Sequence, residues 1–198
     1  MVFLNFAVLG LVAGRLVGGR FTALADIPLA GTRFVFAAIG LQMVAFPWSF
    51  LPWTTPTSVA KALWLVSFAL LIAMLVQNRR LRGAPVVALG LVCNLVAILA
   101  NHGLMPALPQ AMRTAGTHYH VHNNSIQIVH PHLSFLVDRW AVPTWIPMGN
   151  VFSVGDVLIA LGTVIAIAAA MRWRGDAPGT VELEGPTKPA RPVPQPVG

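Results

Sequence analysis

Residues Ser58–Gln77 read SVAKALWLVSFALLIAMLVQ, an apolar run whose one charge, Lys61, lies a turn from its start. A helix needs roughly 20 apolar residues to cross the hydrocarbon core of a bilayer, and this run has that length. Four further apolar segments are near spanning length. The five segments cover about residues 2–17, 34–50, 58–77, 84–101 and 151–171. The sequence therefore predicts an all-α, polytopic membrane bundle of five transmembrane helices, forming a single domain over residues 1–174.

The composition supports the membrane class. Of the 198 residues, 56% are hydrophobic and 10% are charged, whereas soluble chains carry roughly 25% charged residues. One long polar stretch, residues 102–150, separates the last two apolar segments. Residues 175–198 are rich in proline, which prevents helix and strand, so we expect a disordered tail there.

The basic residues predict the orientation of the chain. The formal net charge is +7, and arginine and lysine cluster after the first, third and fifth segments. These positions are Arg15, Arg20, Arg33, Arg79, Arg80, Arg82, Arg172, Arg174, Lys188 and Arg191. Because such residues favour the cytoplasmic side, we expect the N-terminus outside, the C-terminus inside and the 102–150 loop outside. No basic patch alternates with exposed aromatic residues, so nucleic acid is not an expected partner.

Small and polar residues in the segments predict how the helices pack. Gly10, Gly14 and Gly18 share one face of the first segment, where they would let another backbone approach closely. That neighbour is either another segment of this chain or a second membrane protein. Gln42 and Ser67 are expected to form hydrogen bonds between the second and third segments.

All six histidines of the chain lie between His102 and His132, in the polar loop. His118, His120 and His122 alternate, so a strand would place them on one face, and His130 and His132 repeat that spacing. A hairpin would bring the two sets together. Zinc, copper and haem are the cofactors that such a set would suit, with Met105, Met112 and Met148 as softer ligands for copper. The competing interpretation is a solvated loop whose histidines bond to their neighbours.

A second polar group lies at the outer edge of the expected bundle. Asn94 and Asn101 share a helix face, His102 is adjacent, and Asp156 lies a turn into the fifth segment. Ser153 and Asp156 have the spacing of a capping box, which would give Asp156 a structural role. The alternative is a catalytic cluster of Asn101, His102 and Asp156. The sequence contains no HExxH, CxxC, phosphate loop or nucleophile elbow.

The chain resembles a family of small bacterial integral membrane proteins that is catalogued as a domain of unknown function. The resemblance is carried by Gly18-Gly19-Arg20 with Leu24-Ala25-Asp26, by Asn101-His102-Gly103-Leu104-Met105-Pro106, and by Asn150-Val151-Phe152-Ser153-Val154-Gly155-Asp156-Val157. It implies five helices in the bacterial cytoplasmic membrane and an outer loop between the last two, and it implies no activity. The chain departs from the family pattern at His102, where glycine is usual, and its histidine clusters are its own.

Four classes of function remain open. A structural or accessory subunit of a larger membrane complex is favoured, with the bilayer and other membrane subunits as partners, and the chain is not expected to be an enzyme. A metal- or haem-binding protein that uses His118, His120, His122, His130 and His132 is the second class. A membrane enzyme that uses His102 and Asp156 is the third. A transporter is the weakest, because no inverted repeat is visible.

Overall fold

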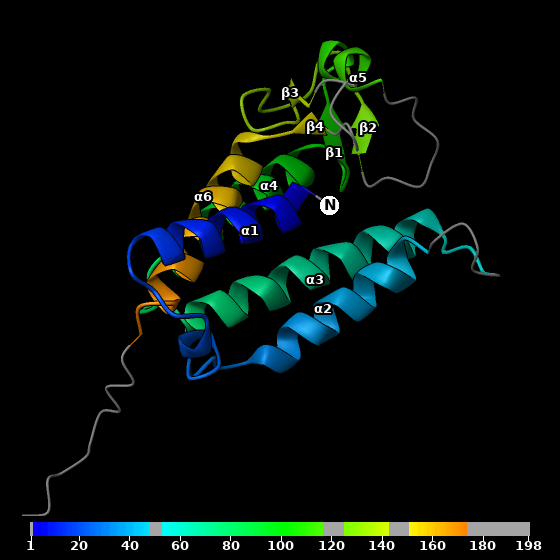
Figure 1. Cartoon of the computed structure of the whole chain (residues 1–198). Helices are drawn as coiled ribbons and strands as arrows, with labels where there is room; N and C mark the ends of the chain where they lie inside the picture. The colour runs from blue at the N-terminus through cyan, green and yellow to red at the C-terminus, as the bar shows by residue number, and fades with distance from the viewer. Residues whose placement is uncertain (1, 48–52, 117–124, 143–150, 174–198) are drawn as a thin grey trace, which may run out of the picture.

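The computed structural model describes residues 2–47, 53–116, 125–142 and 151–173, and the prediction of a mostly helical chain is confirmed (Figure 1). The long helices are α1 (Val2–Leu16), α2 (Thr32–Ala45), α3 (Thr57–Gln77), α4 (Ala84–Ala100) and α6 (Val154–Ala170). A short 3-10 turn, η1 (Phe21–Leu24), follows α1. Within the described ranges α3 alone is long and apolar enough to pass as a membrane span by itself, and the other four are shorter apolar helices. The predicted tail, residues 175–198, lies outside the described residues.

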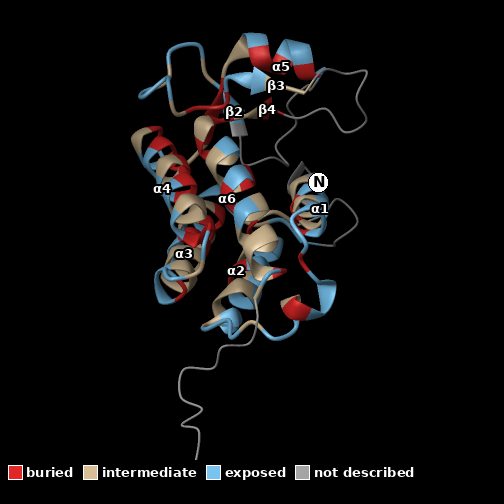
Figure 2. Ribbon diagram, turned by 60° about the vertical axis from the view of Figure 1, so that its left-hand side comes forward, coloured by how far each residue is buried: buried red, intermediate tan, exposed pale blue. Residues whose placement is uncertain are grey.

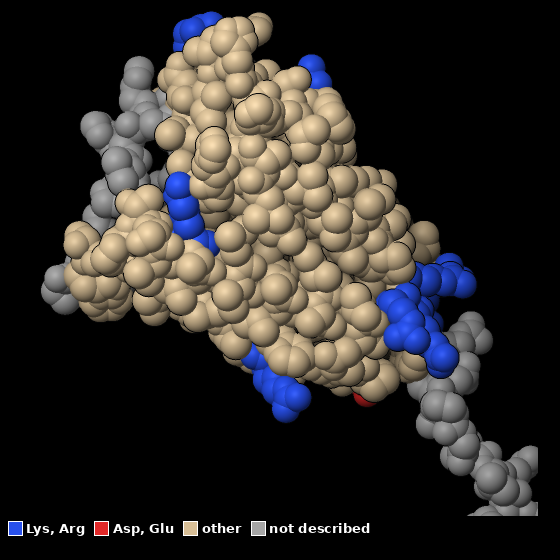
Figure 3. All heavy atoms as spheres, turned by 180° about the vertical axis from the view of Figure 1, so that it is seen from behind, with Lys and Arg blue, Asp and Glu red and all other residues tan. Residues whose placement is uncertain are grey.

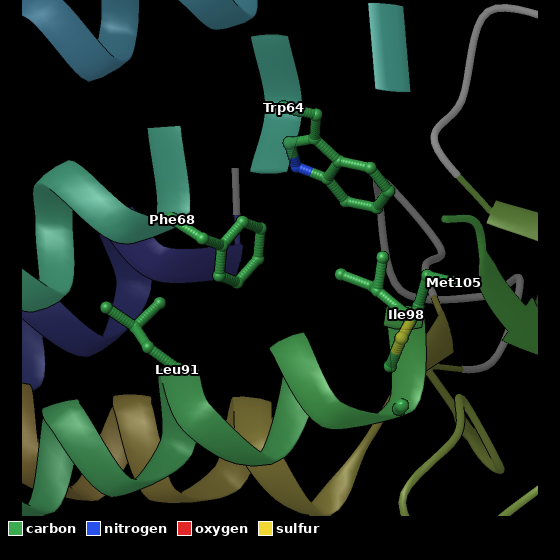
Figure 4. Packing of buried hydrophobic residues seen from close by; sticks show 6 residues of the cluster. Trp64, Phe68, Leu91, Ile98 and Met105 are labelled. Atoms are coloured by element: carbon green, nitrogen blue, oxygen red, sulfur yellow. The ribbon is translucent and has the colours of Figure 1, made fainter. Parts of the chain in front are cut away.

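The long helices pack in the order α1, α6, α4, α3 and α2, each against the next. Trp64 and Phe68 of α3 meet Leu91 and Ile98 of α4 in the main apolar core, and Met105 covers its end (Figure 4). The Trp64 and Phe68 rings lie edge to face, with their centroids 5.7 Å apart. This geometry favours aromatic pairs beyond the area that they bury. The core therefore joins the α2–α3 hairpin to the rest of the bundle.

One polar bond inside the α2–α3 hairpin was expected from the sequence and is confirmed. The Gln42 side-chain amide donates to the Ser67 hydroxyl over 2.9 Å, and that hydroxyl donates to the Trp64 carbonyl. Ser67 is fully buried. A buried polar group without a hydrogen-bond partner is costly, so this bonded pair allows an apolar helix interface to contain a glutamine and a serine.

Glycines bring α4 and α6 into backbone contact. The Gly155 carbonyl oxygen of α6 lies 2.5 Å from the position that a Cβ at Gly90 of α4 would occupy. A turn or two further along, the Gly83 carbonyl oxygen lies 2.9 Å from the corresponding position at Gly162. No side chain larger than hydrogen fits at these positions without moving a backbone. Close approach of this kind lets the two backbones pack in van der Waals contact, which is typical of interfaces between membrane helices.

The three glycines expected on the packing face of the first segment divide into two groups. Gly10 and Gly14 lie against Ile167 and Met171, at the end of α6. Nothing lies within 4 Å of the Cβ position of Gly18, whose φ of +80° instead serves the turn that ends the helix. Two of the three glycines proposed for helix packing therefore face α6, inside this chain, and Gly18 faces open space.

The predicted outer loop contains regular structure that the sequence reading did not anticipate. It holds β1 (Met105–Ala107), α5 (Pro109–Ala115), β2 (Ser125–Gln127) and β3 (Trp140–Ala141), and β3 pairs antiparallel with β4 (Val151–Phe152). We call these five elements the head region. The strand β2 lies between the two histidine sets, for which a hairpin was considered, and it pairs in parallel with β1. Ala107, Ala111, Met112, Ala115 and Val151 form a small core of the head region.

Two predicted helix boundaries need correction. The second segment was expected to continue to residue 50, but α2 ends at Ala45 because Phe46, which precedes Pro47, leaves the helical conformation with φ −129°. The fifth segment was expected from residue 151, but Val151 and Phe152 form β4, and α6 begins only after Ser153. Hydrophobicity alone does not separate a short buried strand from the helix that follows it.

The basic connections meet at the end of the bundle opposite the head region. The Arg20 amide donates to the Met171 carbonyl over 2.7 Å, which joins the first connection to the end of α6. The Asn78 side chain accepts from the Ala30 amide and donates to the Ala30 carbonyl, which joins the first connection to the third. Figure 3 shows most of the lysine and arginine atoms at that end and a broad uncharged belt beside them.

The glycine contact between α4 and α6 predicts a selective loss of stability. Gly155→Ala is expected to lower the free energy of unfolding by about 2 kcal/mol, because its Cβ would overlap the Asn94 carboxamide. Gly40→Ala on α2 is the matched control, since nothing lies within 4 Å of that site, and it should be neutral or stabilising by up to about 1 kcal/mol. Thermal unfolding in detergent measures both, and equal effects would contradict the packing.

Candidate functional site at the junction of α4 and α6

The start of α6 is fixed by the capping box that the sequence predicted. The Ser153 hydroxyl accepts from the Asp156 amide over 3.1 Å, and the Asp156 carboxylate accepts from the Ser153 amide over 2.9 Å. Each side chain thus satisfies a backbone donor that the first turn of a helix leaves free. The negative carboxylate also suits the positive end of the helix dipole. This geometry accounts for both residue types at their spacing of three.

Asn94 of α4 extends the capping box into a link between two helices. Its amide donates to one Asp156 carboxylate oxygen over 3.0 Å, and its own oxygen lies 2.8 Å from the Ser153 hydroxyl. Asn94 and Ser153 are both buried, at 7% and 0% exposure. In the described part of the chain every buried side-chain nitrogen and oxygen has a hydrogen-bond partner. The three residues therefore form a satisfied polar network inside an apolar interface.

Gly155 makes this network possible. The Asn94 oxygen occupies the space where a side chain at residue 155 would begin, and the Gly90 carbonyl oxygen lies 2.7 Å from the same point. Glycine at residue 155 thus admits both the asparagine side chain and the opposite backbone. The run Val151–Asp156 supplies in turn a strand, an N-cap, a close-contact glycine and a capping carboxylate.

Asn101 has a separate structural task at the end of α4. Its amide donates to the Ala97 and His132 carbonyls over 2.8 and 3.0 Å, and its oxygen accepts from the His132 amide over 2.9 Å. The side chain thus pairs with both backbone groups of one distant residue. Asn78 does the same at the end of α3 with Ala30, and it also donates to the Met74 carbonyl. The sequence analysis did not single out Asn78. An asparagine directly after α3, like Asn101 directly after α4, was the signal that could have identified it.

His102 is exposed, and its backbone rather than its imidazole carries the contact. Its carbonyl accepts from the Lys61 ammonium over 2.8 Å. Its φ is +60°, in the left-handed region that disfavours most side chains. The bond to the His102 carbonyl gives a partner to Lys61, the one charge of the apolar run that forms α3. Residue 102 therefore acts through its backbone, which turns here with a positive φ, and the imidazole takes no part in the bond to Lys61.

The structure does not join Asn101, His102 and Asp156 by hydrogen bonds. Within the described ranges Asn101 bonds to Ala97 and His132, whereas Asp156 bonds to Asn94 and Ser153. All the polar atoms of Asn101 and both carboxylate oxygens of Asp156 are thus engaged in bonds that hold the fold. The geometry supports a structural role for these residues and gives no support to a nucleophile or general base.

The histidine cluster is only partly visible. His118, His120, His122 and Met148 lie outside the described residues. His130 and His132 are exposed, and His132 contributes its backbone to the Asn101 bond. Met105 and Met112 are buried in the two apolar cores. Among the residues that the structure places, no group of three or more histidines, cysteines or carboxylates is close enough to hold a metal.

The network predicts that Asp156 acts on stability. Asp156→Ala removes the capping box and leaves the Asn94 amide without its acceptor, so the free energy of unfolding should fall by about 2 kcal/mol. Asp26→Ala, at an exposed carboxylate in the first connection, is the control and should change it by less than about 0.5 kcal/mol. Denaturant unfolding in detergent compares the two. A fully stable Asp156→Ala protein would contradict the structural role.

The backbone at residue 102 predicts an unusual order of tolerance. His102→Gly should keep the stability within about 1 kcal/mol, because glycine adopts a positive φ without strain. His102→Val should lower it by about 1–2 kcal/mol, because a β-branched residue is strained there. Thermal unfolding of the two variants checks the order. The opposite order would contradict the backbone argument, whereas a similar large loss in both variants would mean that the imidazole itself makes a stabilising contact.

Comparison with known proteins places the chain in a family but gives no activity. An uncharacterized protein of Thermotoga maritima is 26% identical over 145 residues, which are 68% of this chain and 77% of the relative. No solved structure matches. A family model described as a family of unknown function, DUF5317, matches residues 26–168, from the first connection to the last turn of α6. The chain belongs to this family of unknown function, DUF5317.

Proposed function

We propose that the protein is a multi-pass protein of the bacterial cytoplasmic membrane, with its N-terminus and head region outside and its C-terminus inside. We further propose that it serves there as a structural or accessory subunit of a larger membrane complex. The observation that carries the proposal is the separate location of the apolar and the polar side chains. Apolar side chains cover the outward faces of the helices, while the polar groups between the helices are engaged in bonds within the chain.

The exposed surface supports membrane embedding. Large apolar side chains face outward on all five long helices, among them Val12, Phe36, Val66, Leu89 and Leu161. A soluble protein rarely exposes contiguous apolar patches of this kind. The 17-residue helices α4 and α6 are about 26 Å long, close to the hydrocarbon thickness of roughly 30 Å. The 21-residue α3 exceeds it.

The position of the charges supports the orientation. The arginines of the first and third connections and Arg172 come together at one end, through the bonds of Arg20 to Met171 and of Asn78 to Ala30. The other end carries the head region. Lysine and arginine near helix ends favour the cytoplasmic side, so the basic end is proposed to face inward.

The open order of helix packing supports a subunit role. α1 packs on α6 and α2 packs on α3, so these two helices stand at the two ends of the row. On α2 the Phe36 side chain is 74% exposed, and Ile39 and Met43 lie on the same outward side. Edges of this kind are where further membrane helices can join the bundle by the van der Waals packing that drives association in lipid.

The orientation predicts opposite labelling of two exposed positions. Cys93, the one cysteine of the chain, is first replaced by serine. In this background Gln110→Cys in the head region should react with a membrane-impermeant maleimide added to intact spheroplasts. Arg80→Cys, in the connection between α3 and α4, should react only after permeabilisation. Both native side chains are exposed, so the pair differs in side rather than in accessibility. Reversed labelling would overturn the orientation, and labelling of both from outside would overturn membrane embedding.

The subunit role predicts a stable complex. Solubilisation in a mild detergent, followed by affinity purification through the C-terminus, should recover the chain with at least one other membrane protein in fixed stoichiometry. Quantitative mass spectrometry of native-gel bands measures the ratio. Phe36→Ala should weaken this association while leaving the folded chain intact, because the Phe36 side chain is 74% exposed and contributes little to the packing of the chain itself. Recovery of the chain by itself in every mild detergent would contradict the role.

A further inference from the structure

The segment between β2 and β3 presents apolar side chains outward from a fixed backbone. Residues 128–136 read IVHPHLSFL, and in this segment Val129, Leu133 and Phe135 are 65%, 39% and 57% exposed. His130 and His132 stand between them and are also exposed. An exposed apolar cluster on a short segment raises the question of what covers it.

Several contacts hold this segment in place. Asn101 bonds to both backbone groups of His132, and the Leu136 amide donates to the Leu133 carbonyl over 2.8 Å. Leu136 packs on the main core, and the fully buried Val137 follows it. Leu133 itself has a φ of +53°, in the left-handed region that disfavours leucine. These contacts therefore hold Leu133 with a strained backbone and an exposed side chain, although burial of that side chain would favour folding.

The position of the segment identifies its surroundings. The bond of Asn101 to His132 places it at the end of α4, and Figure 2 shows this exposed loop directly above that helix. The outward face of α4 carries Leu89, Val92, Val96 and Leu99, spaced by three or four residues along one stripe. If this stripe faces lipid, Val129, Leu133 and Phe135 continue it at the level of the headgroups. Just beyond, the Arg139 guanidinium lies 5.6 Å from the Trp140 ring centroid, and such amphipathic pairs suit a membrane interface.

We propose that residues 129–135 form an interfacial anchor, which inserts Val129, Leu133 and Phe135 into the outer leaflet of the bilayer. The partner is the lipid surface itself. The anchor rests on the proposed membrane embedding and adds a task for the head region. It would fix the depth and tilt of α4, a helix that by itself barely spans the hydrocarbon core. The strained backbone at Leu133 then directs the Leu133 side chain toward the lipid.

Depth measurements with spin labels test the anchor. Each variant carries one labelled cysteine in a Cys93→Ser background, in vesicles of phosphatidylcholine and phosphatidylglycerol. Val129→Cys and Phe135→Cys report on the anchor, Leu89→Cys on the outward face of α4, and Gln110→Cys on the exposed surface of α5. Collision with oxygen, which enters lipid, is compared with collision with a water-soluble nickel chelate. All four native side chains are exposed, so the labels should leave the fold intact.

Labels at 129 and 135 are expected to favour oxygen over nickel by several-fold relative to 110, and so to resemble 89. Labels at 129 and 135 that resemble 110 would overturn the anchor while the membrane bundle stands. Protection of both from oxygen and from nickel would overturn it in favour of a protein partner on this segment. A water-exposed label at 89 would overturn the membrane embedding itself, and the anchor with it.

Discussion

The contact between α4 and α6 is the constraint on which the other features depend. Two pairs of glycines bring the backbones together, and beside one pair Asn94 joins the capping box of Ser153 and Asp156. Without the glycines the asparagine would have no room. Without the asparagine one carboxylate oxygen would lose its donor from α4. The junction also holds the two sides of the molecule, since α1 packs on α6 and α3 packs on α4.

Side-chain amides also join distant parts of the chain after α3 and after α4. Asn78 and Asn101 each follow a helix, bond back to a carbonyl of the last turn, and pair with both backbone groups of a distant residue. One end of the bundle is thereby tied to the first connection and the other to the head region. In each case a single carboxamide satisfies three backbone groups, which leaves fewer of them without a hydrogen-bond partner. These asparagines, like Asp156, therefore hold the helices and connections of the chain together. The outward surfaces are then the part of the molecule left for function.

The sequence predicted the helices well, because long apolar runs limited by arginine or proline have few alternatives. It also predicted the capping box and the bond between Gln42 and Ser67, since spacing and chemistry suffice for both. The head region was missed, because strands of two or three residues leave no periodicity to read, and β1 pairs with a strand some twenty residues away. The cluster of Asn101, His102 and Asp156 was proposed because all three lie at the outer edge of the bundle, on two different segments, and position along a segment does not specify which side chains bond to one another. In the structure Asn101 bonds to His132, whereas Asp156 bonds to Asn94 and Ser153. His102 stands where the family resemblance expects glycine, and its φ of +60° gives the physical reason for that expectation.

The most direct test of the account is a double-mutant cycle between Asn94 and Asp156, with the free energy of unfolding measured in detergent for both single alanine variants and the double variant. The structure predicts a coupling of about 1 kcal/mol or more, because the two side chains share a buried hydrogen bond. Thr163, whose hydroxyl bonds within α6 to the Ile159 carbonyl, is the control partner, and Thr163→Ala should add to Asn94→Ala with no coupling. Additive losses at Asn94 and Asp156 would contradict the claim that their network joins the two helices.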